Sequence, residues 1–314
     1  DWSSDVCSSD LVNMIRLFNQ IILFFVPFLP KFFVSLIAGK YVAGETKDEA
    51  LRHVKSLNEK GFSATIDILG EHVQDKEKAK RVSKSYLDLY DEINNRNLDC
   101  NVSIKPTHIG LGLDPKTFDS NLSSLVQKAK EYNNFLRIDM ENSPYTDSTI
   151  EAFKNSSETY NLVGTVFQAY LYRTENDIES LSNDGFNFRL CKGIYHEDPD
   201  IAIQNRDDIN KNFLKVLKLA FNNGAYVGIA THDLKLLEDV YSLIRDDKID
   251  RSQFEFQVLY GVPMSGWLEK HLENGYKVRV YVPFGPEWYE YSIRRLKENP
   301  NIVGYVLSNF LRKK

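Results

Sequence analysis

The pattern of apolar and polar residues changes near residue 61, where short apolar runs begin to alternate with longer amphipathic segments. A short run rich in β-branched and aromatic residues predicts a buried strand, and a longer segment with apolar residues at every third or fourth position predicts a helix. Helical patterns such as residues 76–97, 205–222 and 233–245 are each long enough for a crossover connection. The predicted strands are residues 63–70, 100–106, 135–141, 163–169, 188–193, 226–231, 254–260 and 277–283.

Strands that alternate with helices pair in parallel, and eight such units close a parallel sheet into a barrel. We therefore predict an α/β fold, a distorted (β/α)8 TIM-type barrel with helices before it. A doubly wound open sheet is the alternative. Against it, the first strand lacks the Gly-x-Gly-x-x-Gly turn of a dinucleotide-binding sheet, because Gly70 is followed by Glu71 and His72.

The chain before the barrel divides into stretches of different composition. Residues 1–10 differ from everything after them and have no basic segment of a signal peptide, so we expect a non-native or disordered tail. Residues 11–37 are strongly apolar, but charges and prolines interrupt every run before the roughly 18 residues that a membrane-spanning helix needs. Residues 45–60 have an amphipathic helical pattern. We assign residues 11–60 to a helical lead-in and residues 61–314 to the barrel.

Composition narrows the class of ligand. The 314 residues are 42% hydrophobic, which is ample for a buried core, and 39 basic against 44 acidic residues give a net charge of -5. No basic field favours nucleic-acid binding, so we expect a small-molecule ligand. Cys7, Cys100 and Cys191 match no disulfide or metal-ligand spacing, which suits a reducing compartment, and we expect a cytoplasmic protein.

Polar side chains end almost every predicted strand, at the edge where barrel enzymes carry their active sites. Core-facing strand ends would otherwise be apolar, so the whole ring indicates a site. Taken singly, each residue also has a structural explanation, such as a helix cap or a lysine that reaches solvent. The ring comprises Asp67, Lys105, His108, Asp139, Glu141, Gln168, Arg189, Lys192, Tyr195, Thr231, His232, Asp233, Gln257, Tyr260 and Tyr281.

The segment after the last predicted strand carries two adjacent arginines on a helix that is expected to begin at Pro286. Tyr291, Arg294, Arg295 and Glu298 share one broad face of this helix. A pair of guanidinium groups can hold a carboxylate from two directions, and a neighbouring glutamate can orient one of them. The alternative is a solvated face with ordinary ion pairs. The position directly after a strand favours a receptor for a small acid.

From about residue 33 to its end, the chain resembles the proline dehydrogenase family of FAD-dependent barrel enzymes. Six segments carry the resemblance in order, and as a set they are highly specific. They are residues 102–105 (VSIK), 137–141 (RIDME), 189–195 (RLCKGIY), 230–233 (ATHD), 254–261 (FEFQVLYG) and 291–299 (YSIRRLKEN).

The resemblance implies oxidation of L-proline to 1-pyrroline-5-carboxylate by hydride transfer to FAD, the first step of proline catabolism. It also implies that electrons pass to a quinone-type acceptor. The family holds the substrate carboxylate with residues that match Lys105, Arg294 and Arg295. Its other substrate-pocket positions match Asp139, Tyr195, Tyr281, Tyr291 and Glu298. Its cofactor positions match Gln168, Arg189, Lys192, Gly193, Thr231, His232 and Gln257.

An enzyme that reduces a quinone gains from resting where its acceptor dissolves. We therefore expect residues 11–37 to make a peripheral contact with the inner face of the membrane, with packing against the barrel as the alternative. Proline and lysine inside this stretch disfavour a spanning helix.

Three other functions stay open on the sequence. A metal-dependent barrel hydrolase or isomerase could use His108, Asp139, Glu141, His232 and Asp233, although no tight ligand spacing supports it. A Schiff-base aldolase could use a lysine at the carboxyl end of a strand, here Lys192. A barrel without catalytic activity could bind FAD or an imino acid.

Overall fold

The structure of the protein is a computed structural model that describes residues 41–181 and 186–298, and of residues 294–298 the backbone alone. The tail expected at residues 1–10 and the apolar stretch at residues 11–37 therefore lie outside the described residues. So does the part of the last predicted segment beyond the final helix.

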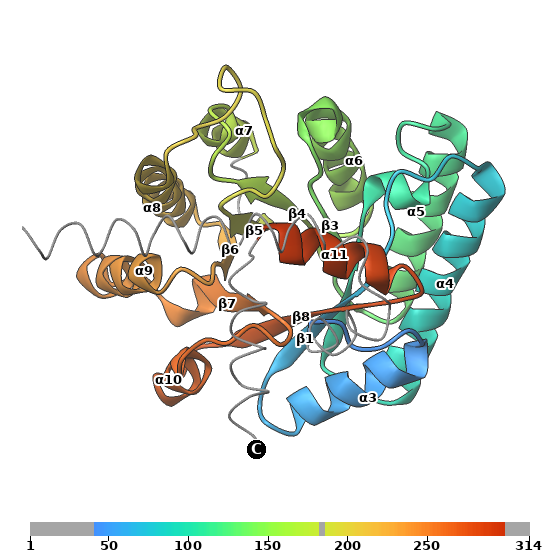
Figure 1. The fold of residues 1–314 in the computed structure, drawn as a ribbon, viewed down its shortest axis with the longest axis horizontal. Helices are drawn as coiled ribbons and strands as arrows, with labels where there is room; N and C mark the ends of the chain where they lie inside the picture. Colours follow the sequence, from blue (N-terminus) through green and yellow to red (C-terminus); the bar gives the residue numbers. More distant parts are fainter. Residues whose placement is uncertain (1–40, 182–185, 299–314) are drawn as a thin grey trace, which may run out of the picture.

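Eight parallel strands pair in sequence order and close into a barrel, which confirms the predicted (β/α)8 fold over the open sheet (Figure 1). The barrel closes where β8 pairs with β1, and Thr65 lies opposite Tyr281 there. Each predicted strand overlaps an observed one, and most predicted runs extend a little too far into the polar residues of the rim. The strands are β1 (Ser63–Ile68), β2 (Cys100–Ile104), β3 (Leu136–Ile138), β4 (Val163–Gln168), β5 (Asn187–Cys191), β6 (Tyr226–Ala230), β7 (Phe254–Leu259) and β8 (Val278–Phe284).

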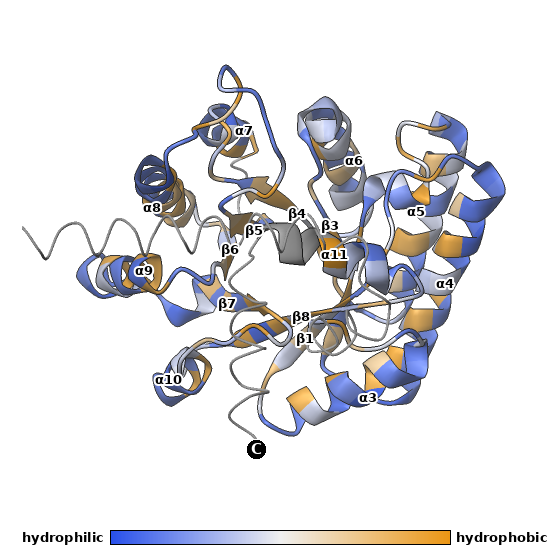
Figure 2. Cartoon of the chain, viewed as in Figure 1, coloured by the Kyte–Doolittle hydropathy of each residue, from blue (hydrophilic) through white to orange (hydrophobic). Residues whose placement is uncertain are grey.

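Helices α4 to α10 connect successive strands and surround the barrel, and their apolar faces turn toward it (Figure 2). The predicted crossover helices are confirmed as α4, α8 and α9. The helices of the ring are α4 (Lys76–Asn95), α5 (Pro115–Glu131), α6 (Thr146–Thr159), α7 (Thr174–Ser180), α8 (Arg206–Asn222), α9 (Leu234–Asp246) and α10 (Trp267–Glu273). Short 3-10 turns are η2 (Pro106–Ile109), η3 (Ser143–Tyr145) and η4 (Arg251–Gln253).

Short polar side chains fix where several of these helices begin. Asp75, Asp114, Asn205 and Asp233 precede α4, α5, α8 and α9, and each accepts hydrogen bonds from backbone N–H groups of the first turn. Those N–H groups have no partner within the helix, so a side-chain acceptor stabilises the helix start. Asp233 therefore has a structural role at the rim of the barrel.

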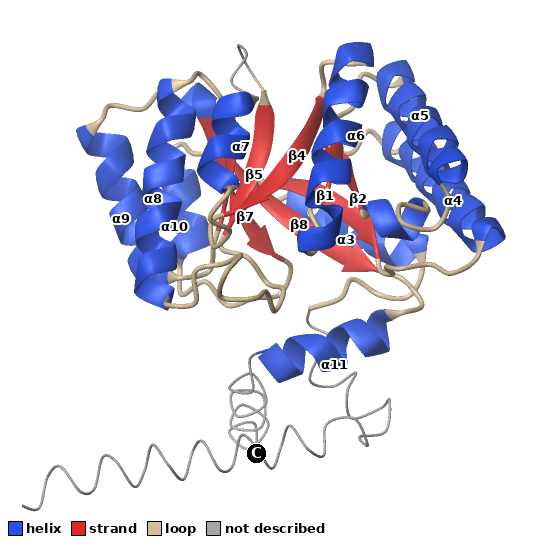
Figure 3. Ribbon diagram, turned by 90° about the horizontal axis from the view of Figure 1, so that it is seen from above, coloured by secondary structure: helices blue, strands red, loops and turns tan. Residues whose placement is uncertain are grey.

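The helices at the two ends of the described chain take different places relative to the ring. Helix α3 (Lys47–Asn58) packs outside β1 and β8, where a helix following β8 would complete the ring. Helix α11 (Trp288–Glu298) instead lies across the carboxyl-terminal opening of the barrel, apart from the ring (Figure 3). Tyr291 on α11 packs against Val42 and Leu69, and the indole N–H of Trp288 donates to Glu45 at 2.5 Å.

The last strand and helix differ slightly from the prediction. We expected a break at Pro283 and a helix from Pro286, but β8 runs through Phe284 and α11 begins at Trp288. Pro283 has no N–H to donate, yet its carbonyl still accepts from the backbone N–H of Ala43 at 2.8 Å. The strand thus ends one residue later, and the helix begins two residues later, than the sequence predicts.

The interior of the barrel is polar, unlike the layers of branched apolar side chains that are common in this fold. Glu255 on β7 accepts from the Nε of Arg279 on β8 at 2.7 Å, and Arg279 also donates to the carbonyl of Ala64 at 2.8 Å. Arg137 on β3 donates to the carbonyl of Thr165 at 2.7 Å. Apolar packing is concentrated between the outer faces of the strands and the helices. The polar interior extends to the carboxyl-terminal opening of the barrel, which α11 covers.

A buried histidine lies in the aromatic cluster between α9, α10 and β7. The ring of His271 stacks on Phe256 with the ring centroids 3.8 Å apart, and its Nδ1 is 2.9 Å from the hydroxyl of Tyr241. Its Nε2 is buried and has no hydrogen-bond partner within the part of the chain that the structure describes. Burial, together with the nearby charge of Lys270, lowers the pKa of His271 from 6.5 to about 4.

This histidine is expected to make the fold sensitive to mild acid. Below pH 6.5 the unfolded chain takes up a proton that folded His271 does not bind until about pH 4. The free energy of unfolding should therefore fall by about 2 kcal/mol between pH 7.5 and 5 through this residue. Urea unfolding of the wild type and of His271→Phe, which keeps a stacking ring, measures the difference. Identical pH dependence of the two proteins would contradict this role.

Candidate active site

The carboxyl-terminal half of the barrel interior brings together side chains from six strands or strand ends. They form one continuous set of hydrogen bonds and ion pairs directly under α11. Barrel closure is what assembles them, because they are far apart along the chain. The members are Asp67 (β1), Ser103 and Lys105 (β2 and its end), Asp139 (after β3), Arg189 (β5), Gln257 (β7) and Tyr281 (β8).

Asp67 is the acceptor at the centre of this set. Its side chain is fully buried and pairs with the ammonium of Lys105, which is 15% exposed. Oδ2 also accepts from the hydroxyl of Tyr281 at 2.7 Å, and Oδ1 accepts from the hydroxyl of Tyr86 at 2.8 Å. Burial raises the pKa of Asp67 above its ordinary value, with a further contribution from Asp139, although Lys105 and Tyr281 favour the ionised form. Burial lowers the pKa of Lys105, but Asp67 and Asp139 raise it more, so this lysine stays charged.

Asp139 is the second carboxylate of the set. Oδ1 accepts from the hydroxyl of Ser103 at 2.5 Å and from Nη1 of Arg189 at 2.9 Å. Oδ2 lies 3.2 Å from the hydroxyl of Tyr281. Asp139 is therefore held by the polar network rather than serving as a helix cap. Tyr281 lies between the two carboxylates, and the guanidinium of Arg189 lies over its ring at 5.0 Å.

Arg189 and Gln257 hold each other inside the barrel. Nε of Arg189 donates to Oε1 of Gln257 at 2.6 Å, and Nε2 of Gln257 donates to Glu255 at 2.7 Å. Gly228 lies beside both residues on β6, and a Cβ at that position would collide with the amide of Gln257. The glycine therefore makes room for the side chain that orients Arg189.

The remaining predicted cofactor residues lie on the same side of the barrel, at the ends of β4 to β6. Lys192 pairs with Asp233, and the hydroxyl of Thr231 accepts from the backbone N–H of Asp233 at 3.2 Å. Nε2 of His232 accepts from the backbone N–H of Leu259 at 2.9 Å. Gln168 is buried, and its amide donates to the carbonyl of Glu141 at 3.1 Å.

Gly193 provides a close approach to the backbone on this side. Its φ of +118° is a conformation that residues with a side chain rarely adopt, and a Cβ there would collide with the ring of Tyr170. Tyr170 thus packs directly on Gly193, and the two cations beside it are paired with carboxylates, Arg189 with Asp139 and Lys192 with Asp233. These two donors suit an anionic, phosphate-bearing cofactor.

Tyr195 lies half-buried on the loop that follows β5. Glu197 holds this loop to the start of η3, because its carboxylate accepts from both the backbone N–H and the hydroxyl of Ser143, each at 2.7 Å. The sequence indicates Tyr195 but gives no sign of the carboxylate that fixes its loop.

The residues predicted on the last helix lie on α11, over the opening. Tyr291 is buried. Arg294, Arg295 and Glu298 belong to the part of α11 whose side chains lie outside the described structure. A hollow of about 160 Å³ separates the start of α11 from the loop after β1, and it is lined by Gly70, Glu71, Glu287, Glu290 and Tyr291.

Two members of the network, Asp67 and Ser103, and the helix residue Tyr86 that contacts it went unassigned in the sequence. Asp67 belonged to the polar ring but received no role, although a charged residue inside the run from Ala64 to Ile68 is a usable signal. Ser103 and Tyr86 gave no signal, because a serine on a strand and a tyrosine on an amphipathic helix are ordinary. Their function depends on contacts that only the folded chain makes.

Most residues of the alternative metal site make other contacts, and His108 is the exception, because its buried Nδ1 has no hydrogen-bond partner among the described residues. His232 and Asp233 bind the backbone and Lys192, and Asp139 binds Arg189. Within residues 41–181 and 186–298, donor atoms of another group lie within 4.8 Å of one another, namely Glu71, His72 and Glu141. Both carboxylate oxygens of Glu141 already accept hydrogen bonds from Thr107.

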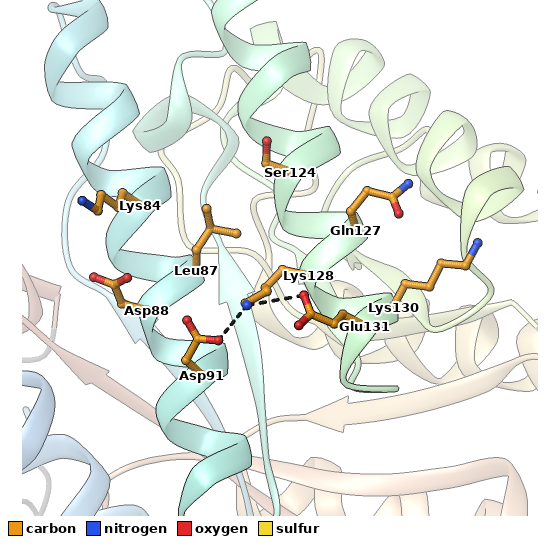
Figure 4. Close-up of a pocket in the computed structure, with 9 residues that line it drawn as sticks. All are labelled: Lys84, Leu87, Asp88, Asp91, Ser124, Gln127, Lys128, Lys130 and Glu131. Carbon is orange, nitrogen blue, oxygen red and sulfur yellow. Dashed lines mark hydrogen bonds and ion pairs between the residues drawn. The ribbon is translucent and has the colours of Figure 1, made fainter.

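A second hollow among the described residues lies away from the barrel opening. It has a volume of about 630 Å³ and separates α4 from α5 on the outer surface (Figure 4). Lys128 in this groove already pairs with Asp91 at 2.6 Å and with Glu131 at 3.4 Å. The groove is thus a solvated seam between two helices, apart from the charged network under α11.

Together, the closed barrel and the charged network at its carboxyl end define a (β/α)8 barrel of the enzyme type. The chain matches the family model for proline dehydrogenase over residues 50–306. It therefore belongs to the proline dehydrogenase family, which confirms the resemblance seen in the sequence.

Individual relatives support the same family assignment. Proline dehydrogenase 2 of Bacillus subtilis (strain 168) is 34% identical over 276 residues, which cover 88% of this chain and 91% of the relative. Proline dehydrogenase of Deinococcus radiodurans is 33% identical over 282 residues, with 88% and 90% covered. The crystal structure of proline utilization A (PutA) from Bdellovibrio bacteriovorus, inactivated by N-propargylglycine, has the same fold, with a TM-score of 0.77 and 24% identity. The match covers 84% of this chain and 32% of that longer one.

No helix within the described part of the chain combines the length and apolar character required to cross a membrane.

Proposed function

We propose that this protein is an FAD-dependent proline dehydrogenase that oxidises L-proline to 1-pyrroline-5-carboxylate, the first step of proline catabolism. The observation that carries the proposal is the buried pair of Asp67 and Lys105 at the opening of the barrel, under the helix that bears Arg294 and Arg295. Family membership supports the same reaction. In this proposal residues 61–314 form the catalytic unit and residues 11–60 lead into it.

The substrate carboxylate is held by Lys105 from below and by Arg294 and Arg295 from α11. A charged lysine with its counter-ion behind it, on the side of Asp67, presents its positive charge toward the opening. An arginine pair adds the planar donor geometry that matches a carboxylate. Glu298 and Tyr291 complete the α11 side of the pocket.

The substrate ring is positioned by Asp139, Tyr195 and Tyr281. Tyr281 is fixed by its hydrogen bond to Asp67, and Arg189 covers one face of its ring, so its position under the opening is well defined. Hydride loss from the carbon beside the nitrogen requires a neutral amine. The protein's contribution is therefore mainly to bind, orient and exclude water.

FAD is held on the β4 to β7 side, where the donor set fits it. Arg189 and Lys192 supply guanidinium and ammonium donors, and the amide of Gln257 and the carboxylate of Asp233 hold them in place. When bound there, FAD would supply the hydride acceptor, with a quinone-type compound as the final electron acceptor. The cofactor contacts in this proposal are Gln168, Arg189, Lys192, Gly193, Thr231, His232 and Gln257.

The visible spectrum tests the proposal. The protein loaded with FAD and desalted should be yellow, and anaerobic L-proline should bleach it, because reduced flavin loses its visible absorption. Cyclopentanecarboxylate keeps the ring and the acid but lacks the nitrogen, so it should compete with proline without bleaching. A soluble quinone added afterwards should restore the colour.

A protein that stays colourless after loading, or that stays yellow with L-proline, would argue against the proposed reaction. If L-proline bleaches the protein but the quinone does not restore its colour, only the proposed quinone-type acceptor is contradicted.

A cytoplasmic location with a peripheral membrane contact through residues 11–37 belongs to the same proposal. Flotation of the full-length protein with anionic liposomes tests that contact, and its absence would favour packing against the barrel.

A further inference from the structure

Tyr86 reaches the active-site network from outside the barrel. It lies on α4 in the outer ring of helices and is completely buried. Its hydroxyl lies 2.8 Å from Oδ1 of Asp67 and within 3.3 Å of the backbone N–H and carbonyl of Ile68. The hydroxyl has one proton, and the shorter contact to a charged acceptor favours its donation to Asp67.

This contact completes the hydrogen bonding of the Asp67 carboxylate. Lys105 and Tyr281 bind Oδ2, and Tyr86 binds Oδ1. The terminal torsion of an aspartate is broad, so donors on one oxygen alone leave the plane of the carboxylate loosely defined. A donor on the other oxygen fixes that plane. The direction of Oδ2, and with it the position of the Lys105 ammonium, then depends on a residue that touches no substrate.

We propose that Tyr86 is a positioning residue for substrate binding, which fixes Asp67 and, through Asp67, the Lys105 ammonium that receives the substrate carboxylate. This inference rests on the proposed role of Lys105 in proline binding. It extends the site beyond the barrel wall to the first helix of the ring.

Helix α4 offers a matched control one turn further on. Tyr90 is also completely buried, and its hydroxyl donates to the carbonyl of Phe135 at 3.3 Å, outside the Asp67 network. Tyr86→Phe and Tyr90→Phe each remove one buried hydroxyl and keep the ring. A purely structural tyrosine would behave alike at both positions.

The experiment compares the two variants as FAD-loaded proteins. Tyr86→Phe is expected to raise the KM for L-proline and the Kd for cyclopentanecarboxylate by about 2- to 10-fold, the size of one hydrogen bond, with kcat nearly unchanged. The rise should be larger toward acid pH, because Asp67 without this donor protonates more readily. Tyr90→Phe should leave both constants unchanged. Equal effects in the two variants, or none in Tyr86→Phe, would overturn the proposal.

A double-mutant cycle with Asp67→Asn tests whether Tyr86 acts through Asp67. In the Asp67→Asn background, Tyr86→Phe should have no further effect on Kd, and this double variant also leaves no buried carboxylate unpaired. Additive effects would contradict the proposal. The single variant Lys105→Met distinguishes a wrong positioning role for Tyr86 from a wrong substrate-binding role for Lys105. If it weakens carboxylate binding and Tyr86→Phe does not, only the positioning role is wrong; if neither change weakens binding, the proposed role of Lys105 fails with it.

Discussion

Replacing Lys105 by methionine is expected to raise the KM for L-proline at least tenfold and to lower the free energy of unfolding by roughly 3–5 kcal/mol. Both effects come from one ammonium group. Toward the opening it offers a charge-assisted contact to the substrate carboxylate, which is worth about 1.5–3 kcal/mol. Toward the interior it neutralises Asp67, whose side chain is fully buried. Without Lys105, that carboxylate is left as an uncompensated buried charge. Steady-state kinetics and urea unfolding measure the two effects.

The two effects can be separated with a second substitution. Lys105→Met combined with Asp67→Asn removes both charges of the pair, so most of the lost stability should return. Substrate binding should not return, because no cation faces the carboxylate. A double variant that regains normal KM would show that Lys105 serves only the fold. Normal KM in the single variant would remove Lys105 from the substrate site.

Replacing Glu255 by methionine is expected to lower the melting temperature by roughly 6–20 °C, from a loss of about 3–5 kcal/mol. Glu255 is 3% exposed and accepts from Arg279 and from Gln257, both at 2.7 Å. Methionine is close in length but leaves the guanidinium of Arg279 buried without its carboxylate. Calorimetry or a thermal melt followed by circular dichroism measures the change.

An exposed ion pair provides the control for this substitution. Arg245 and Asp246 lie 2.9 Å apart with both side chains mostly in solvent, so Asp246→Asn should change stability by less than about 0.5 kcal/mol. Arg279→Met added to Glu255→Met should recover part of the loss, because it removes the uncompensated charge. Equal melting temperatures for Glu255→Met and the wild type would contradict a structural role for the interior pair.

The barrel was predictable from sequence because its signal is local. Each strand is a short run of apolar residues, each connecting helix has its own period, and the alternation of the two fixes parallel pairing. The position of α11 was not predictable in this way. An amphipathic helix after the last strand fits the ring equally well, and what moves it over the opening is the packing of Tyr291 on Val42 and Leu69 together with α3 beside β8.

The site was predictable at the level of residue types and strand ends. A polar ring at the carboxyl edge indicated where chemistry lies, and the resemblance to a family selected residues within it. The pairs themselves were not predictable. Asp67 binds Lys105 across 38 residues, and Arg189 binds Gln257 across 68. Which carboxylate meets which cation depends on barrel register and on room made by residues such as Gly228.

The seam between β1 and β8 also has a consequence for how the protein acquires activity during folding. The hydrogen bond from Tyr281 to Asp67 crosses this seam and joins residues 214 positions apart. Contacts of such long range form only after most of the chain has lost its freedom, so they belong to the late events of folding. A chain still lacking β8 has neither this bond nor a closed barrel. For the substrate site that we propose, binding of L-proline therefore requires a closed barrel.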